Sequence, residues 1–133
     1  MARFVLAVAV IFITYLCPAF AEDKAPKRPV PRTELVPLTS LTISDEQFLK
    51  GDANGKTATI AAEFRIARPT GAQPVVVLMH GSGGIGSNIS MWVDEINSLG
   101  ISTFVIDGFT GRGLQGTGTN QALLGRLNFI LDI

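Results

Sequence analysis

The stretch from Pro74 to Ser87, with the sequence PVVVLMHGSGGIGS, limits the fold more than any other part of this chain. It joins a short apolar run, Val75–Met79, to a glycine-rich loop through a single histidine, His80. An apolar run without alternation is typical of a strand in a parallel sheet that is covered on both faces. Parallel sheets carry their binding sites at the carboxyl ends of the strands, so the sequence predicts an α/β fold with a site at His80 and the glycines.

Residues 1–21 have the composition of a secretory signal peptide. Arg3 precedes an apolar core, Phe4–Leu16, and the small residues Ala19 and Ala21 provide a cleavage site. The core is shorter than the ~20 residues that a membrane-spanning helix needs. We therefore expect cleavage and export to the periplasm or the outside, with an uncleaved anchor as the alternative. Cleavage after Ala21 removes Cys17, the only cysteine, and leaves no disulfide and no thiol nucleophile.

Residues 22–34 are rich in proline and in charges of both signs, which predicts an exposed linker before a folded domain at residues 35–133. The whole chain has 11 basic and 11 acidic residues. This balance creates no field that would attract nucleic acid or an anionic membrane surface. We therefore do not expect nucleic acid as a partner.

The first elements of the domain are predicted from the spacing of apolar residues. Leu35–Ile43 is predicted to be a strand, which Pro37 confines to a sheet edge. Thr57–Ile66 alternates with a period of two, as is typical of a half-buried antiparallel strand near an edge. Between them, Asp45–Lys50 is ambiguous and Gly51–Gly55 is predicted to be a turn.

The segment after the glycine loop has the pattern of an amphipathic helix, Asn88–Leu99. Trp92 falls on its apolar stripe and is expected in the core. Ser87 or Asn88 is expected to cap the first turn, and Gly100 to end the helix in the left-handed conformation.

Ile101–Ile106 is predicted to be a second buried strand, parallel to the first, because strand–helix–strand connections are right-handed. As an apolar strand at the sheet margin it would form an uncovered edge. Gly108–Thr119 contains five glycines around Arg112, which predicts an unstructured loop at the same carboxyl edge as His80. Asn120–Asp132 returns to helical spacing.

Three chemistries place glycines between a strand and a helix. A phosphate loop needs a lysine after its last glycine, and no lysine follows Lys56, so that interpretation fails. A dinucleotide fingerprint fits Gly81-x-Gly83-x-x-Gly86, with Asp107 at the end of the next strand for a ribose contact, and it stays open as an alternative. The third chemistry is an oxyanion hole, in which backbone amides stabilise the charge on a carbonyl oxygen under attack.

Several motifs resemble one family in their order along the chain. VVVLMHGSGG, the helix with Trp92, the strand STFVID and the loop with Phe109 and Arg112 are similar to the N-terminal half of α/β-hydrolases of the dienelactone hydrolase type. The resemblance covers about Thr57 to Asp132. It implies the first part of a hydrolase sheet, with an antiparallel edge strand followed by a parallel β-α-β-α unit.

The resemblance implies hydrolysis of a small carboxylic ester or lactone by an activated nucleophile, without a metal or a cofactor. The backbone amide of Ser82, together with that of Gly83, would be the catalytic oxyanion donor. In this family the base follows the nucleophile and the acid near the end of the chain, so His80 is expected to orient the loop rather than to transfer protons.

Three further residues are expected to support this loop. Gly81 gives the backbone freedom beside the oxyanion donors. Asp107 is expected to be a loop-fixing carboxylate, and Arg112 is expected to pair with Asp107, to line the substrate entrance or to be solvated.

The sequence has no second histidine and no G-x-S-x-G or G-x-C-x-G motif. The nucleophile, acid and base of a hydrolase are therefore missing from these residues. We expect an incomplete N-terminal part of a longer enzyme that is inactive alone. A dinucleotide-binding half-domain and a non-enzymatic exported binding module are the alternatives.

Overall fold

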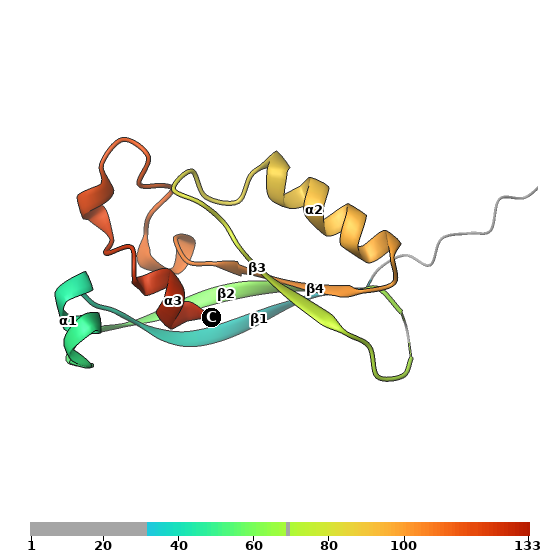
Figure 1. Ribbon diagram of the computed structural model, residues 1–133, viewed down its shortest axis with the longest axis horizontal. Helices are drawn as coiled ribbons and strands as arrows, with labels where there is room; N and C mark the ends of the chain where they lie inside the picture. Colours follow the sequence, from blue (N-terminus) through green and yellow to red (C-terminus); the bar gives the residue numbers. More distant parts are fainter. Residues whose placement is uncertain (1–31, 69) are drawn as a thin grey trace, which may run out of the picture.

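The computed structural model describes residues 32–68 and 70–133, which form a mixed α/β domain around one four-stranded sheet (Figure 1). The predicted signal peptide and most of the predicted linker lie outside the described residues. In chain order the elements are β1 (Arg32–Thr42), α1 (Asp45–Lys50), β2 (Lys56–Ile66), β3 (Val75–Met79), α2 (Ser87–Ser98), β4 (Ser102–Asp107), the 3₁₀ turns η1 (Thr110–Arg112) and η2 (Gln121–Leu123), and α3 (Asn128–Asp132).

The sheet has the strand order β1-β2-β4-β3. β1 pairs antiparallel with β2, and β2 pairs antiparallel with β4. β3 and β4 are parallel, as the strand–helix–strand pattern predicts. β1 lies at an edge, in agreement with Pro37, but it begins at Arg32, so the last three residues of the predicted linker belong to the sheet.

β2 lies next to the edge strand β1, which agrees with the prediction that it is near an edge. The predicted position of β4 is wrong, because β4 pairs with β2 on one side and β3 on the other. β4 is therefore not the uncovered edge. That place belongs to β3, which pairs only with β4 among the described residues.

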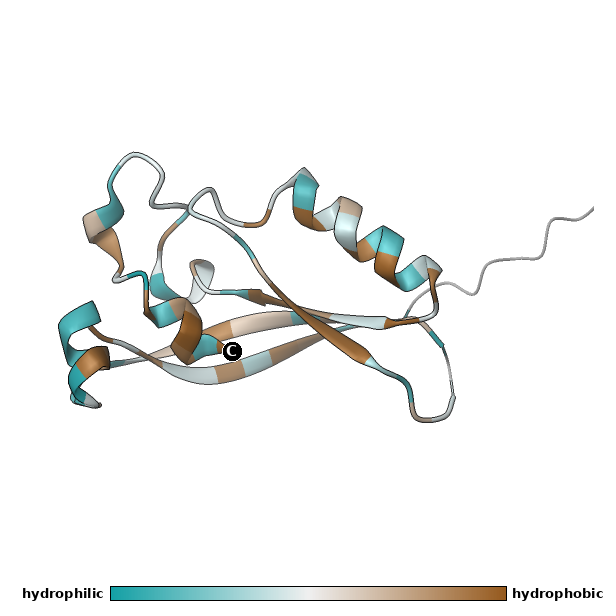
Figure 2. Cartoon of the chain, viewed as in Figure 1, coloured by the Kyte–Doolittle hydropathy of each residue, from teal (hydrophilic) through white to brown (hydrophobic). Residues whose placement is uncertain are grey.

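β3 is apolar along most of its length (Figure 2), yet it is not covered on both faces as its sequence predicts. The side chains of Val75 and Val77 are 45% and 46% exposed. The physical reason is the strand's place at the edge, where only one neighbouring strand and the flank of one helix contribute contacts. Apolarity alone therefore predicted the strand but not its degree of burial.

The two faces of the sheet carry separate apolar clusters. On one face, α2 places Ile89 and Val93 against Val105 of β4 and Leu78 of β3. The cluster on the other face is formed by alternate residues of β2, among them Ile60, together with β4. Its buried members are Ala58, Ile60, Ala62 and Ile106.

The start of α2 and the position of Trp92 differ from the predictions. Gly86 occupies the N-cap, with no side-chain hydrogen bond, so neither Ser87 nor Asn88 caps the helix. Trp92 is 53% exposed rather than buried. The helix contacts the sheet along the line of Ile89 and Val93, and Trp92 lies at the margin of that line.

The ambiguous segment after β1 is the short helix α1. Ser44 and Gln47 form a reciprocal capping box at its start, and Gly51 ends it with a left-handed φ of 67°. The S-x-x-Q pattern could have identified this helix from the sequence, because the serine and glutamine side chains satisfy each other's backbone amides.

The predicted continuous helix over residues 120–132 is wrong, because η2 and α3 are separate. Leu124 between them has an extended backbone, with φ −150° and ψ 129°. Gly125 packs so closely that a Cβ atom there would lie 2.7 Å from Oδ1 of Asp45. Within the part of the chain that the structure covers, no helix is long and apolar enough to cross a membrane.

Candidate functional site

The glycine loop and the Asp107 loop meet at the carboxyl ends of the two parallel strands. Met79 of β3 is in register with Ile106 of β4, so the next residues, His80 after β3 and Asp107 at the end of β4, lie side by side. The Nε2 atom of His80 lies 3.9 Å from Oδ1 of Asp107. This is the juxtaposition that the parallel pairing predicts.

His80 joins these two loops through both ring nitrogens. Its Nε2 accepts a hydrogen bond from the amide of Gly108 at 3.1 Å, and its Nδ1 lies 2.8 Å from the carbonyl oxygen of Gly81. An accepting Nε2 assigns the proton to Nδ1, which then donates to Gly81. His80 is only 2% exposed, and both nitrogens are engaged within the protein. This geometry suits a residue that holds loops, and it leaves no nitrogen to act as a base.

Two phenylalanines pack on the His80 ring. The ring centroids of Phe109 and Phe129 lie 4.5 Å and 5.3 Å from that of His80, and 5.4 Å from each other. Phe109 follows β4 and Phe129 belongs to α3, so the cluster connects α3 to the ends of both parallel strands. Such tilted and edge-on aromatic contacts add stability beyond the burial of area.

Asp107 fixes the start of η1. Its Oδ1 accepts hydrogen bonds from the backbone amides of Phe109, at 2.9 Å, and Thr110, at 3.0 Å. Partial burial raises the pKa of the Asp107 carboxyl, but the hydrogen bonds from Thr110 and Phe109 outweigh it. The net result is a pKa below the ordinary value of 3.8. Asp107 is thus a hydrogen-bonded, ionised loop carboxylate.

The glycine loop also touches the loop after η1, backbone against backbone. The amide of Thr117 donates a hydrogen bond of 2.7 Å to the carbonyl oxygen of Ser82. A Cβ atom on Gly116 would lie 3.0 Å from that same oxygen, and one on Gly84, which has a φ of +79°, would lie 3.0 Å from the carbonyl oxygen of Gln115. Close approach favours glycine at both positions, and the positive φ favours it further at Gly84.

The amides of Ser82 and Gly83 stand apart from this network. Among the described residues, neither amide donates a hydrogen bond to a protein acceptor, and both residues are exposed. Added Cβ atoms on Gly81 and Gly83 would meet no atom within 4 Å. The loop is therefore open on this side while its carbonyl side is fixed by Thr117. Two neighbouring amides in such a loop can bind the oxygen of a ligand.

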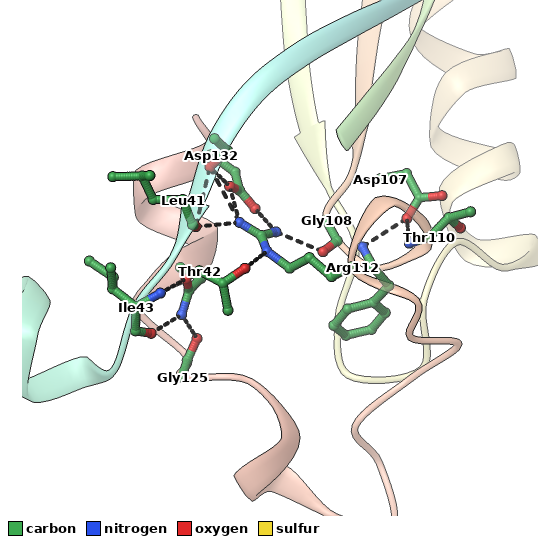
Figure 3. Close-up of polar contacts among 12 residues, drawn as sticks. Leu41, Thr42, Ile43, Asp107, Gly108, Thr110, Arg112, Gly125 and Asp132 are labelled. Carbon is green, nitrogen blue, oxygen red and sulfur yellow. Dashed lines mark hydrogen bonds and ion pairs between the residues drawn. The ribbon is translucent and has the colours of Figure 1, made fainter. Parts of the chain in front are cut away.

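Two of the roles considered for Arg112 are wrong: it does not pair with Asp107, and it is not solvated. Its side chain is only 3% exposed and forms a bidentate ion pair with Asp132 at 2.7 and 2.8 Å (Figure 3). Its other hydrogen bonds go to Gly108 and Leu41 carbonyl oxygens and to the Ser40 and Thr42 hydroxyls. Every guanidinium N–H therefore has an acceptor, which is what allows the charge to be buried.

Two residues that the sequence analysis missed tie the segment after Gly125 to β1. Asp132 binds Arg112 and accepts a hydrogen bond of 2.5 Å from Ser40. Asn128 is buried, accepts from the amide of Ile43 at 3.0 Å and donates to the carbonyl oxygen of the same residue at 2.7 Å. No local pattern indicates these roles, because the partners lie far apart in the sequence.

The described residues contain no group of three or more histidine, cysteine or acidic side chains that could hold a metal ion. Comparison with known proteins adds no assignment. A scan against protein-family models gave no match to the chain, and a search of curated proteins gave no similar protein.

Proposed function

We propose that this chain provides the oxyanion-hole part of an exported α/β-hydrolase, of the dienelactone hydrolase type, that acts on small carboxylic esters or lactones. The observation that carries the proposal is the glycine loop at the carboxyl end of β3. Ser82 and Gly83 are exposed residues whose amides have no described protein acceptor, while Thr117 holds the Ser82 carbonyl oxygen at 2.7 Å. Fixed donors that await an acceptor are what oxyanion stabilisation needs, because they cost no rearrangement during the reaction.

The proposed reaction begins when a nucleophile attacks the carbonyl carbon of the ester. The carbonyl oxygen becomes negatively charged in the tetrahedral intermediate, and the Ser82 and Gly83 amides donate hydrogen bonds to it. Collapse of the intermediate expels the alcohol and leaves an acyl-enzyme, which water hydrolyses in a second attack through the same donors. No step of this scheme uses a metal or a cofactor.

The nucleophile, acid and base of this reaction are proposed to come from outside these 133 residues. His80 is the only histidine of the sequence, and its two nitrogens bind Gly81 and Gly108. The antiparallel pair β1–β2 followed by the parallel unit β3-α2-β4 supports the resemblance to the first part of a hydrolase sheet. The family remains a proposal that rests on the sequence motifs.

A second candidate is a dinucleotide-binding half-domain. It is favoured by the start of α2, where Gly86, the third glycine of the fingerprint, is the N-cap and no side chain caps the helix. Two arrangements weigh against it. The Asp107 carboxylate, which would bind a ribose, already accepts from two amides of its own loop, and β4 pairs with the antiparallel strand β2. Saturable binding of NADH, measured by fluorescence, would favour this candidate over the hydrolase.

The hydrolase proposal is tested by reading the source DNA beyond the codon for Ile133. We expect an open frame that encodes G-x-S-x-G or G-x-C-x-G, followed by an acidic residue and a histidine. A stop codon directly after Ile133, with a folded product of that length, would contradict the proposal and favour a non-enzymatic binding module. The 133-residue chain alone is expected not to turn over an activated aryl ester. Turnover that serine reagents abolish would contradict the external origin of the nucleophile.

A further inference from the structure

A cavity of about 240 Å³ lies directly beside Ser82. Its buried walls come from Phe109 after β4 and Leu124 after η2, with Phe129 of α3 and Thr117 beside them. The lining is mostly apolar. The cavity therefore touches the glycine loop at Ser82 and is otherwise built from the segments after β4 and after η2 and from α3.

The walls of this cavity are held in place by contacts that do not depend on a ligand. Phe109 and Phe129 pack on each other and on the buried ring of His80. The amide of Thr117 is bonded to Ser82, and Gly125 is fixed by its close approach to Asp45 and by Asn128. The walls of this cavity are therefore positioned by contacts within the protein.

The mouth of the cavity is polar and accessible. Ser82, Gln121 and Arg126 line it and are exposed, whereas Phe109 and Leu124 on the walls are 2% and 5% exposed. A ligand can thus enter with its apolar group first and leave a polar group at the mouth, next to Ser82. This is the orientation that an ester needs if its carbonyl oxygen is to meet the loop.

The volume limits the group that fits. An apolar cavity of about 150 Å³ is enough to bind benzene, and pockets for drug-sized ligands are about 300–1,000 Å³. A space of about 240 Å³ therefore accepts one ring with a small substituent, but not a fused ring system or a long chain.

We propose that this cavity binds a single neutral, apolar ring, and that it selects esters or lactones that carry such a ring next to the reacting carbonyl. The selection of esters or lactones rests on the proposed function, whereas the binding of a ring does not. Leu124 is the residue that limits the size of the ring, because it is buried on the wall and comes from the segment between η2 and α3.

The test is a titration of fluorobenzene into the full chain, followed by ¹⁹F NMR. We expect saturable binding that Leu124→Phe weakens by at least about tenfold, or about 1.4 kcal/mol, because the larger side chain fills the cavity. Leu123→Phe is the matched control. Leu123 is the neighbouring residue and does not line this cavity, so the affinity of that variant should stay within about twofold.

Thr117→Leu fills the same cavity from the opposite loop and covers the case in which Leu124→Phe fails to fold, as judged by thermal unfolding. No saturable binding to the wild-type chain would overturn the proposal, as would equal binding by the Leu123 and Leu124 variants. Fluorobenzene has no ester bond, so its binding does not depend on catalysis. If fluorobenzene binds but the reading frame ends at Ile133, the proposed ring binding is supported and the proposed hydrolase function is contradicted. If the reading frame continues as expected but fluorobenzene does not bind, the hydrolase function is supported and the ring binding is contradicted.

Discussion

At the scale of single residues, Arg112 and Asp132 are the most consequential pair in the structure. Both side chains are almost fully buried, and the guanidinium joins three parts of the chain: β1, the loop after β4 and α3. A buried ion pair is weak evidence for net stability, since both charges lost their hydration. Removal of one partner is different, because the other charge is then left buried without compensation.

We therefore predict that Asp132→Asn lowers the free energy of unfolding by about 3–5 kcal/mol. Urea denaturation of the full chain at neutral pH measures the effect. The control is Asp94→Asn, which removes an exposed carboxylate 3.6 Å from Arg65 and should cost no more than about 1 kcal/mol. Equal losses for the two variants would contradict the structural role of Arg112.

Asp107 makes a prediction about pH. Its folded-state pKa is lowered, so its charged form stabilises the fold at pH values above its ordinary pKa of 3.8, and this contribution is lost as the pH falls below that value. The wild type should be more stable than Asp107→Asn at pH 7, and the difference should shrink below pH 3.8. A difference that stays constant or grows on acidification would show that the carboxylate does not hold the loop.

The sequence predicted the part of the candidate site that the parallel strand pairing brings together. His80, the glycines and Asp107 lie at the carboxyl ends of adjacent strands, so the sheet alone places them side by side. Arg112 was given the wrong partner, because its true partner, Asp132, lies 20 residues away across a turn that breaks the predicted helix. Residue type and spacing carry no information about such a contact.

At the scale of elements, the glycine loop and the loop after η1 act as one unit. Their contact consists of backbone atoms, and the Thr117–Ser82 hydrogen bond is its centre. Glycines at 84 and 116 allow the two backbones to approach. A side chain at either residue therefore has to separate the loops.

We predict that Gly116→Ala weakens this contact, because its Cβ would lie 3.0 Å from the Ser82 carbonyl oxygen. Hydrogen exchange of the Thr117 amide should become faster by about tenfold or more, which corresponds to about 1.4 kcal/mol. Gly118→Ala is the matched control, since its Cβ would lie at an ordinary distance of 4.0 Å from the same oxygen. Similar exchange rates in both variants would mean that the two loops are not coupled through Ser82.

Element type was more predictable than element length or burial. The pattern of apolar residues, alternating in some strands and continuous in others, identified four strands and the helix α2. It failed for residues 120–132, where helical spacing persists but Leu124 is extended and Gly125 packs against Asp45. It also failed for Trp92, because a periodic stripe is wider than the line along which α2 contacts the sheet.

At the scale of the whole molecule, the strand order decides which surfaces are exposed. β4 sits between β2 and β3, so the apolar strand β3 is left at the edge with Val75 and Val77 half exposed. The order of strands depends on long-range pairing, which a single sequence does not encode in any local pattern. The parallel pairing of β3 and β4, which positions the site, could be predicted because one connection determines it.

The proposed stabilisation of an oxyanion by the Ser82 amide can be measured as the kcat for phenyl acetate of the protein encoded by the complete reading frame. Ser82→Pro removes the amide N–H, and Ser82→Ala keeps it while removing the hydroxyl. We predict that Ser82→Pro lowers kcat by about 10²–10³ with unchanged thermal unfolding, and that Ser82→Ala stays close to the wild type. A Ser82→Pro enzyme as active as the wild type, or an equal loss of kcat in Ser82→Ala, would contradict a role of the Ser82 amide in catalysis.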